Sequence, residues 1–381
     1  MEQEKIYLHD YEEKLLDTRE DLQEYLDHIK ATDKWVTPTV NECQVLGLDS
    51  QTNIEEVLKI NKVSISNDDV MATIENENHF SLYVNNLFGN LVHPVRYTAF
   101  PDIEARAGLY GRAIENSVEK QDIQVLPVRI KAFWLSQCFA LNAELCKILV
   151  RDGKVSSMKS KKYQPFMQWD VISHTENRLS SIFPEYAFSA GRVSHEGLVV
   201  EYKLNAKIME DGFANTLSQF GFGLTADDIN TRLIVSTSDI GSSCVSASPI
   251  MEVQGVPMRL GKRIELRHDV GNTLEMWEEV LTNIAVSLQE AEDKVEELGN
   301  ISIVNAQSVF ETMAEELKIP KKISQNIQFI ATSAIDIYLA LNQCVDDMAG
   351  DLNLSQMIDL REKVARYLYV DYEAYDRRVS V

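Results

Sequence analysis

The sequence predicts an α+β protein whose sheet-rich central domain is flanked by an N-terminal helical segment and a C-terminal helical unit. Strand-like alternation is concentrated between about residues 148 and 267, whereas apolar residues three and four apart dominate both ends. Charge divides the chain in the same way, with a net charge of −12 over residues 1–90, +1 over 91–270 and −11 over 271–381. We therefore predict three units with these boundaries: an acidic N-terminal helix and mixed segment, an α+β domain, and an acidic all-helical unit.

The first thirty residues carry a heptad-like pattern that predicts one helix with a partner helix. The apolar positions are Leu8, Tyr11, Leu15, Thr18, Leu22, Tyr25 and Ile29. The Thr-Pro-Thr at residues 37–39 ends the pattern, and the Asn- and Asp-rich stretch from residue 40 to 90 gives no clear assignment.

The central block opens with two predicted helices, one from Pro101 and one from Pro127 to about Leu141. A β-hairpin is predicted next, because Asp152-Gly153 lies between two strand-like runs and readily adopts a type I′ turn. A helix from Phe166 to Leu179 and further strands follow. The strands are expected within residues 186–207 on either side of 194–197, and then at 231–236, 243–253 and 257–267.

From Asn272 the pattern changes to strict three-four spacing, which predicts a long helix as far as about Leu298. Such a seam packs by default inside the same chain, but its strict spacing also favours pairing with another subunit, so its first apolar positions are candidate oligomerisation residues. These positions are Leu274, Trp277, Leu281, Ile284 and Leu288. Further helices are predicted over about 304–317, 322–348 and 355–369.

Five scattered cysteines without a Cys-x-x-Cys pair are typical of reduced thiols, and the charged N-terminus lacks the apolar stretch of a signal peptide. No apolar run is long enough for a membrane span. We therefore expect a cytoplasmic protein of a bacterial host with no membrane partner.

Motifs for catalysis are not found. No Gly-rich stretch ends in Gly-Lys-Ser or Gly-Lys-Thr, and no two of the seven histidines have the i, i+4 spacing of metal ligands on a helix. We therefore predict a non-enzymatic protein with no catalytic residues, no metal site and no cofactor.

One cationic group stands out, around the hairpin and in the last predicted strand. Cations beside aromatic rings suit a single nucleic-acid strand, because the cations neutralise phosphates and the rings stack on bases. The candidate residues are Arg151, Lys154, Lys159, Lys161, Lys162 and Tyr163, with Arg263 and Arg267 further along the chain. The alternative is a solvated hairpin whose rings belong to the core.

Three stretches resemble the phage/plasmid-like family known as domain of unknown function 932. They are VRDGKVSSMKSKKYQPFMQWDVI from Val150, VSTSDIGSSCVSASPIM from Val235 and IELRHD from Ile264. Thr237 stands where that family has an asparagine, and its Cys-x-Asn-Gly motif is missing. The resemblance implies a mobile-element gene near replication and recombination genes and supplies no catalytic residue.

Three functions follow as hypotheses. The first is a self-assembling, homo-oligomeric protein of phage or plasmid DNA metabolism that binds or anneals single-stranded DNA. The second is an acidic interaction protein that inhibits a host defence enzyme through its ends. The third is a structural assembly protein of the element or virion.

Overall fold

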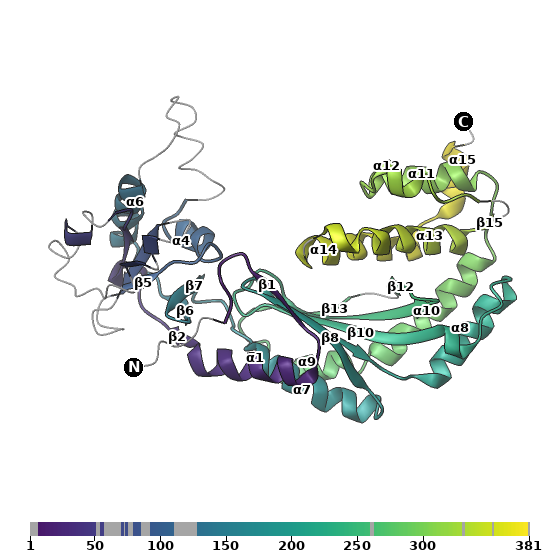
Figure 1. Cartoon of the computed structure of the whole chain (residues 1–381), viewed down its shortest axis with the longest axis horizontal. Coiled ribbons are helices and arrows are strands. Elements are labelled where there is room, and N and C mark those ends of the chain that lie inside the picture. Colours follow the sequence, from purple (N-terminus) through teal and green to yellow (C-terminus); the bar gives the residue numbers. More distant parts are fainter. Residues whose placement is uncertain are drawn as a thin grey trace.

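The computed structural model describes residues 7–50, 54–56, 70–71, 73–74, 79–84, 92–109, 128–259, 263–329, 332–352 and 354–379. It is an α+β structure with a smaller lobe, on the left of Figure 1, and a larger lobe built on a long twisted sheet. Within these described ranges, no helix has the length and apolar character needed to cross a membrane.

The larger lobe contains a seven-stranded antiparallel sheet in the order β1-β8-β9-β10-β11-β12, with β13 also paired to β11. The strands predicted in the central block are confirmed, although the last predicted strand is divided between β12 and β13. Their bounds are β1 Glu13–Leu16, β8 Ala187–Ser194, β9 Gly197–Lys203, β10 Ile229–Thr237, β11 Val245–Val253, β12 Val256–Arg259 and β13 Ile264–Leu266.

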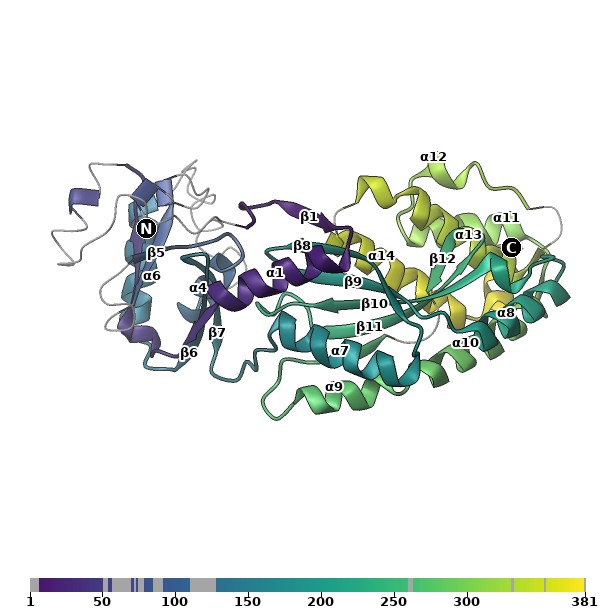
Figure 2. The ribbon, with the colours of Figure 1, turned by 60° about the horizontal axis from the view of Figure 1, so that its bottom comes forward.

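One face of this sheet is apolar and covered by helices. On β9, Leu198, Val200 and Tyr202 are buried in this core, whereas Glu201 and Lys203 alternate with them. Figure 2 shows α1, α7 and α9 along this face, and α10 continuing from α9 beside α8. The helices are α1 Arg19–Thr32, α7 Gln168–Ile182, α8 Lys207–Gln219, α9 Leu274–Leu281 and α10 Ile284–Gly299.

The opposite face is polar and only partly covered, because α13 and α14 pack near β12 and leave the sheet open toward β8 (Figure 1). Arg232 on this face forms ion pairs with both Glu201 and Glu252. The C-terminal elements are β14 Ser302–Ile303, α11 Ala306–Glu316, α12 Lys321–Ser324, β15 Thr332–Ser333, α13 Ala334–Asp347, α14 Leu354–Ala365 and α15 Tyr372–Val379. The helix predicted over 322–348 is therefore interrupted by β15.

The smaller lobe packs two three-stranded sheets against α6 around a core of its own. The predicted hairpin is confirmed, and its turn has the positive φ values of Asp152 (52°) and Gly153 (70°). The elements are β2 Lys34–Val36, β3 Cys43–Gly47, β4 Phe80–Val84, β5 Val92–Pro94, α4 Phe100–Arg106, α6 Val128–Ala140, β6 Cys146–Arg151 and β7 Lys154–Ser160. The helix predicted from Pro101 is α4, which ends at Arg106 because Gly108 turns the chain with a φ of 77°. Residues 110–127 lie outside the described part of the chain.

The single N-terminal helix predicted from Leu8 to Ile29 is wrong. Residues Glu13–Leu16 form β1, which pairs with β8, and the helix begins only at Arg19. Thr18 caps it in a reciprocal capping box with Asp21, which fixes the start of the helix at that point. The predicted boundary at residue 90 also falls inside a sheet, because β4 and β5 pair across it.

The long helix predicted from Asn272 to Leu298 is also wrong, because it consists of α9 and α10. The amides of Thr282 and Asn283 bond to carbonyls three residues back, so the chain tightens and turns between the two helices. Four of the five seam residues, Trp277, Leu281, Ile284 and Leu288, are fully buried in the chain's own core, and Leu274 is half-buried against it. The seam is therefore packed within the chain.

Candidate functional site

The three stretches that carry the family resemblance meet in space where the two lobes join. Arg151, the last residue of β6, is buried and donates from Nε and Nη2 to the Asp33 carboxylate, at 2.7 and 2.5 Å. Its Nη2 also donates to Asp239, in the loop after β10. One guanidinium thus joins β6, the end of α1 and the β10–β11 loop.

Two buried carboxylates share this single cation, and the pKa values of Asp33 and Arg151 are both shifted. Burial raises the pKa of Asp33 to about 6, although Arg151 opposes the shift. Burial acts to lower the pKa of Arg151, but the charges of Asp239 and Asp33 outweigh it and raise that pKa. The arginine therefore stays charged, and Asp33 binds a proton more readily than an exposed aspartate.

Tyr163 connects the other two stretches. Its hydroxyl donates to the Asp239 carbonyl at 2.7 Å, and its ring lies between Trp35 and His268, with centroids 6.0 and 4.9 Å away. Gly241 has φ of +70°, and a Cβ there would lie 2.7 Å from the Tyr163 ring. Only glycine permits this loop to approach the ring so closely.

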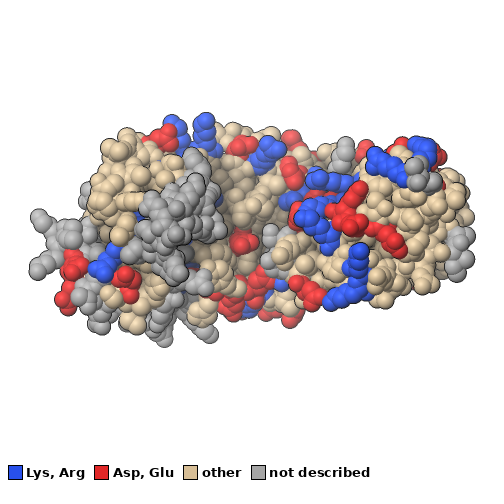
Figure 3. Space-filling model, turned by 90° about the horizontal axis from the view of Figure 1, so that it is seen from above, with Lys and Arg blue, Asp and Glu red and all other residues tan. Residues whose placement is uncertain are grey.

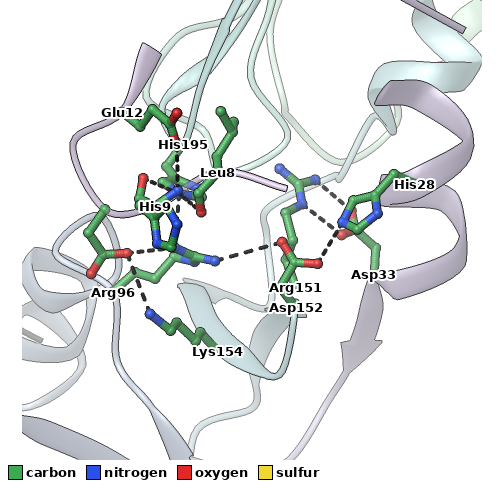
Figure 4. A network of polar contacts seen from close by, with 11 residues as sticks. Leu8, His9, Glu12, His28, Asp33, Arg96, Arg151, Asp152, Lys154 and His195 are labelled. Carbon is green, nitrogen blue, oxygen red and sulfur yellow. Dashed lines mark hydrogen bonds and ion pairs between the residues drawn. The ribbon is translucent and has the colours of Figure 1, made fainter. Parts of the chain in front are cut away.

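A second buried cation, Arg96, lies close to the first (Figure 4). It donates to Asp10 at 2.5 Å and lies 3.8 Å from Asp152, which in turn bonds His28 at 2.7 Å. His195 Nε2 is 2.9 Å from Arg96 Nη1 and within 3.1 Å of the carbonyl oxygens of Leu8 and His9. Together these contacts tie the N-terminal segment and the smaller lobe to the β8–β9 turn.

His195 is held neutral in this environment. Burial, followed by the charges of Arg96 and Arg151, lowers its pKa to about 3. Nε2 faces both the Arg96 guanidinium, which can only donate, and two carbonyl oxygens, which can only accept, so these contacts do not fix which ring nitrogen carries the proton of the neutral imidazole.

Acidification is expected to destabilise the wild-type protein through His195. A histidine with a pKa of about 6.5 unfolded and about 3 folded contributes stability that is complete above pH 6.5 and is lost as the pH falls. Between pH of about 7.5 and about 5 the loss is about 2 kcal/mol, from 1.36 kcal/mol per pH unit. Urea unfolding of wild type and His195→Gln at both pH values measures it.

Glutamine is the matched replacement because its amide offers both a donor and an acceptor and does not titrate. The raised pKa of Asp33 acts in the opposite direction, favouring the folded state as the pH falls toward 4, but both proteins share it. The difference between them therefore isolates His195, and parallel pH profiles would contradict the assignment.

The structure separates the predicted nucleic-acid-binding residues into two groups. Ion pairs engage Arg151, Lys159 (with Asp102, 2.6 Å) and Arg263 (with Glu362, 3.2 Å), and Lys154 lies 4.0 Å from Asp10. By contrast, Lys161, Lys162 and Arg267 are exposed and form no ion pair with any described residue. These three residues are called the basic strip below.

The basic strip lies on two segments that are held together. Tyr163 and Asp269 form a β-bridge, and the amide of Gln164 donates to the His268 carbonyl at 2.9 Å. The strip therefore flanks the stacked rings of Trp35, Tyr163 and His268, of which each is half-buried.

A cavity of about 230 Å³ lies on the polar side of the sheet, beneath α14. The β10–β11 loop connects this cavity to the stacked rings, because its Gly241 packs on Tyr163 and its next two residues line the cavity. The lining residues are Ser194, Glu196, Gly197, Leu198, Val199, Ser236, Thr237, Ser242, Ser243, Arg263, Asp359 and Glu362. Figure 3, which views this side of the molecule, shows acidic and basic side chains intermixed.

Sequence reasoning missed most partners of the buried network. Asp10, Asp33, Arg96 and His195 lie far from the hairpin in sequence, and no local motif marks them. The Ser-Asp-x-Gly stretch that carries Asp239 was a usable signal, because it belongs to the resemblance. In the described part of the chain, no three His, Cys, Asp or Glu side chains are grouped as metal ligands would be.

Comparison with protein-family models, with curated proteins and with solved structures finds no match for this chain.

Proposed function

We propose that this chain is a non-enzymatic protein that binds single-stranded nucleic acid along the basic strip. The observation that carries the proposal is a set of three exposed cations, none of which pairs with a described residue, beside a stack of partly exposed rings. Such a surface is suited to a single strand, whose phosphates lie against cations while its bases stack on rings. The family resemblance adds a role in phage or plasmid DNA metabolism.

The charge distribution also supports this location. The chain has a net charge of −22, so most of its surface repels a polyanion. Arg151, Lys154 and Lys159 are removed from the binding surface because carboxylates neutralise them. Self-assembly remains part of the proposal only through surfaces other than the buried α9–α10 seam.

Reversing the charges of the basic strip is expected to weaken binding of a fluorescent oligothymidylate by at least about tenfold. In the Lys161→Glu/Lys162→Glu/Arg267→Glu variant the strip loses three phosphate contacts, so the dependence of log K on log salt becomes shallower by about 2. Fluorescence anisotropy across a salt series measures both quantities.

The matched control is Lys207→Glu/Lys321→Glu/Lys322→Glu, which makes the same change in net charge at exposed positions on α8 and α12, at the far end of the larger lobe (Figure 1). It is expected to bind within about twofold to threefold of wild type, from screened long-range charge alone. Equal weakening by both variants, or no binding by wild type, would reject the proposed function.

A second candidate function is favoured by the acidic side chains of α9 and α10, the helices that cover one face of the sheet. Between Leu274 and Gly299 the chain has eight acidic residues and one lysine, and that lysine pairs with Glu297. Several of these carboxylates are exposed on α10: Glu290, Asp293, Glu296 and Glu297. Such a ridge suits a basic partner protein, and loss of that partner on reversal of Glu290, Asp293 and Glu296 to lysine tests it.

A further inference from the structure

The cavity beneath α14 has a wall that is fixed before any ligand arrives. Its β10–β11 loop is held from behind by Asp239 on Arg151 and by Tyr163 on the Asp239 carbonyl. Ser238 and Ser242 both donate to the Glu196 carbonyl, at 2.6 and 2.5 Å, and so join the loop to the β8–β9 turn. A preorganised polar wall binds a ligand at a lower entropic cost than a mobile one.

The lining indicates a ligand that offers N–H donors. The lining residues include three acidic side chains, Glu196, Asp359 and Glu362, and one basic side chain, Arg263, so their formal charge is negative and the cavity is unsuited to a phosphate. Glu362 is occupied by Arg259 and Arg263, and Asp359 by Lys363, whereas Glu196 has no ion pair with any described residue.

Other groups of the lining complement a flat polar ring. Val199 on β9 supplies apolar surface on this side of the sheet. The Arg263 guanidinium, whose Nε and Nη1 already pair with Glu265 and Glu362, keeps further N–H groups for a carbonyl or ring nitrogen.

The size and position of the cavity suit one base of a single-stranded nucleic acid that is bound along the basic strip. Its 230 Å³ is smaller than the roughly 300–1,000 Å³ of pockets for drug-sized ligands, so it accommodates a single ring system. Arg263 of the cavity and Arg267 of the strip lie on either side of β13, about 13 Å apart at about 3.3 Å per residue. A strand on the strip therefore passes within a few nucleotides of the cavity.

We propose that this cavity binds one unpaired nucleobase that bears an exocyclic amino group, with Glu196 accepting from the amino group. The inference rests on the proposed function, since the strand is delivered by the basic strip. Cytosine offers the amino donor and thymine replaces it with a carbonyl, so the cavity discriminates between two bases of the same ring size. Phosphates remain outside, on the strip.

The test compares oligodeoxycytidylate with oligothymidylate of equal length, about ten nucleotides, on the full chain by fluorescence anisotropy. Wild type is expected to bind the cytosine strand about fivefold to tenfold more tightly. Ser243→Leu, which fills the cavity from an exposed rim position, is expected to abolish this preference. Glu196→Gln is expected to reduce it, because the amide loses the charge of the acceptor.

Ser180→Leu, exposed on α7 on the other side of the sheet, is the matched control and keeps the preference. Equal binding of both strands by wild type, or a preference that survives Ser243→Leu, overturns the base site while leaving the strip's binding intact. Failure of both strands to bind rejects the proposed function itself, and with it the inference.

Discussion

Methionine in place of Arg151 is expected to lower the free energy of unfolding by about 3–5 kcal/mol. The side chain of Arg151 is buried, and its removal leaves Asp33 and Asp239 facing each other without a cation. Breaking a buried ion pair from one side has this cost because the remaining charge cannot be solvated. Urea unfolding at neutral pH, followed by circular dichroism, measures the loss.

Lys363→Met is the matched control, since it removes a cation from the exposed Lys363–Asp359 pair on α14. That change is expected to cost less than about 0.5 kcal/mol. Adding Asp33→Asn and Asp239→Asn to Arg151→Met is expected to recover part of the lost stability, because both buried charges are then gone. If Arg151→Met costs no more than Lys363→Met, the network does not stabilise the joint between the lobes.

Leu281→Ala is expected to lower the free energy of unfolding by about 2–5 kcal/mol without changing the mass in solution. Leu281 is fully buried in the core that α7 and α9 share with the sheet, so truncation leaves a cavity. Urea unfolding and light scattering on the same samples give the two quantities.

Val286→Ala is the companion control, because Val286 is 56 % exposed on α10 and its truncation removes few contacts. We expect a change within about 0.5 kcal/mol. A fall in mass with unchanged stability in Leu281→Ala would show that the seam lies between chains, contrary to the observed packing.

The strands of the central sheet were predictable because alternation records a sheet with two different faces. Val200 and Tyr202 face apolar helices, while Glu201 and Lys203 face the open side, so the period of two is visible in the sequence. The Asp152-Gly153 turn was predictable for a local reason as well, since few other residue pairs tolerate two positive φ values.

The heptad interpretation was wrong because the same spacing serves two kinds of packing. Trp277, Leu281, Ile284 and Leu288 bury a stripe against α7 and a sheet, and nothing in the stripe distinguishes this partner from another coiled-coil strand. The break at Thr282-Asn283 preserves the stripe, so the periodicity does not reveal it.

The site was only partly predictable, because a charge count does not include partners distant in sequence. Arg151 and Asp33 are 118 residues apart, and Arg96 and His195 are 99 apart. The local density of Lys and Arg in the sequence identified the hairpin correctly as cationic. Ion pairs with residues distant in sequence, however, decide which of these cations remain exposed. Lys161, Lys162 and Arg267 remain so because they lie at the edge of the joint.

The pairing of β1 with β8 has a consequence for synthesis on the ribosome. Glu13 pairs with Ser194 and Leu16 with Gly191, so the first strand has no partner until nearly half of the chain has been made. At about 5–20 residues per second, that delay is about 10–40 seconds. During that delay the segment before α1 is available to chaperones and proteases, and β1 gains its partner strand while β9 to β13 are still to be made.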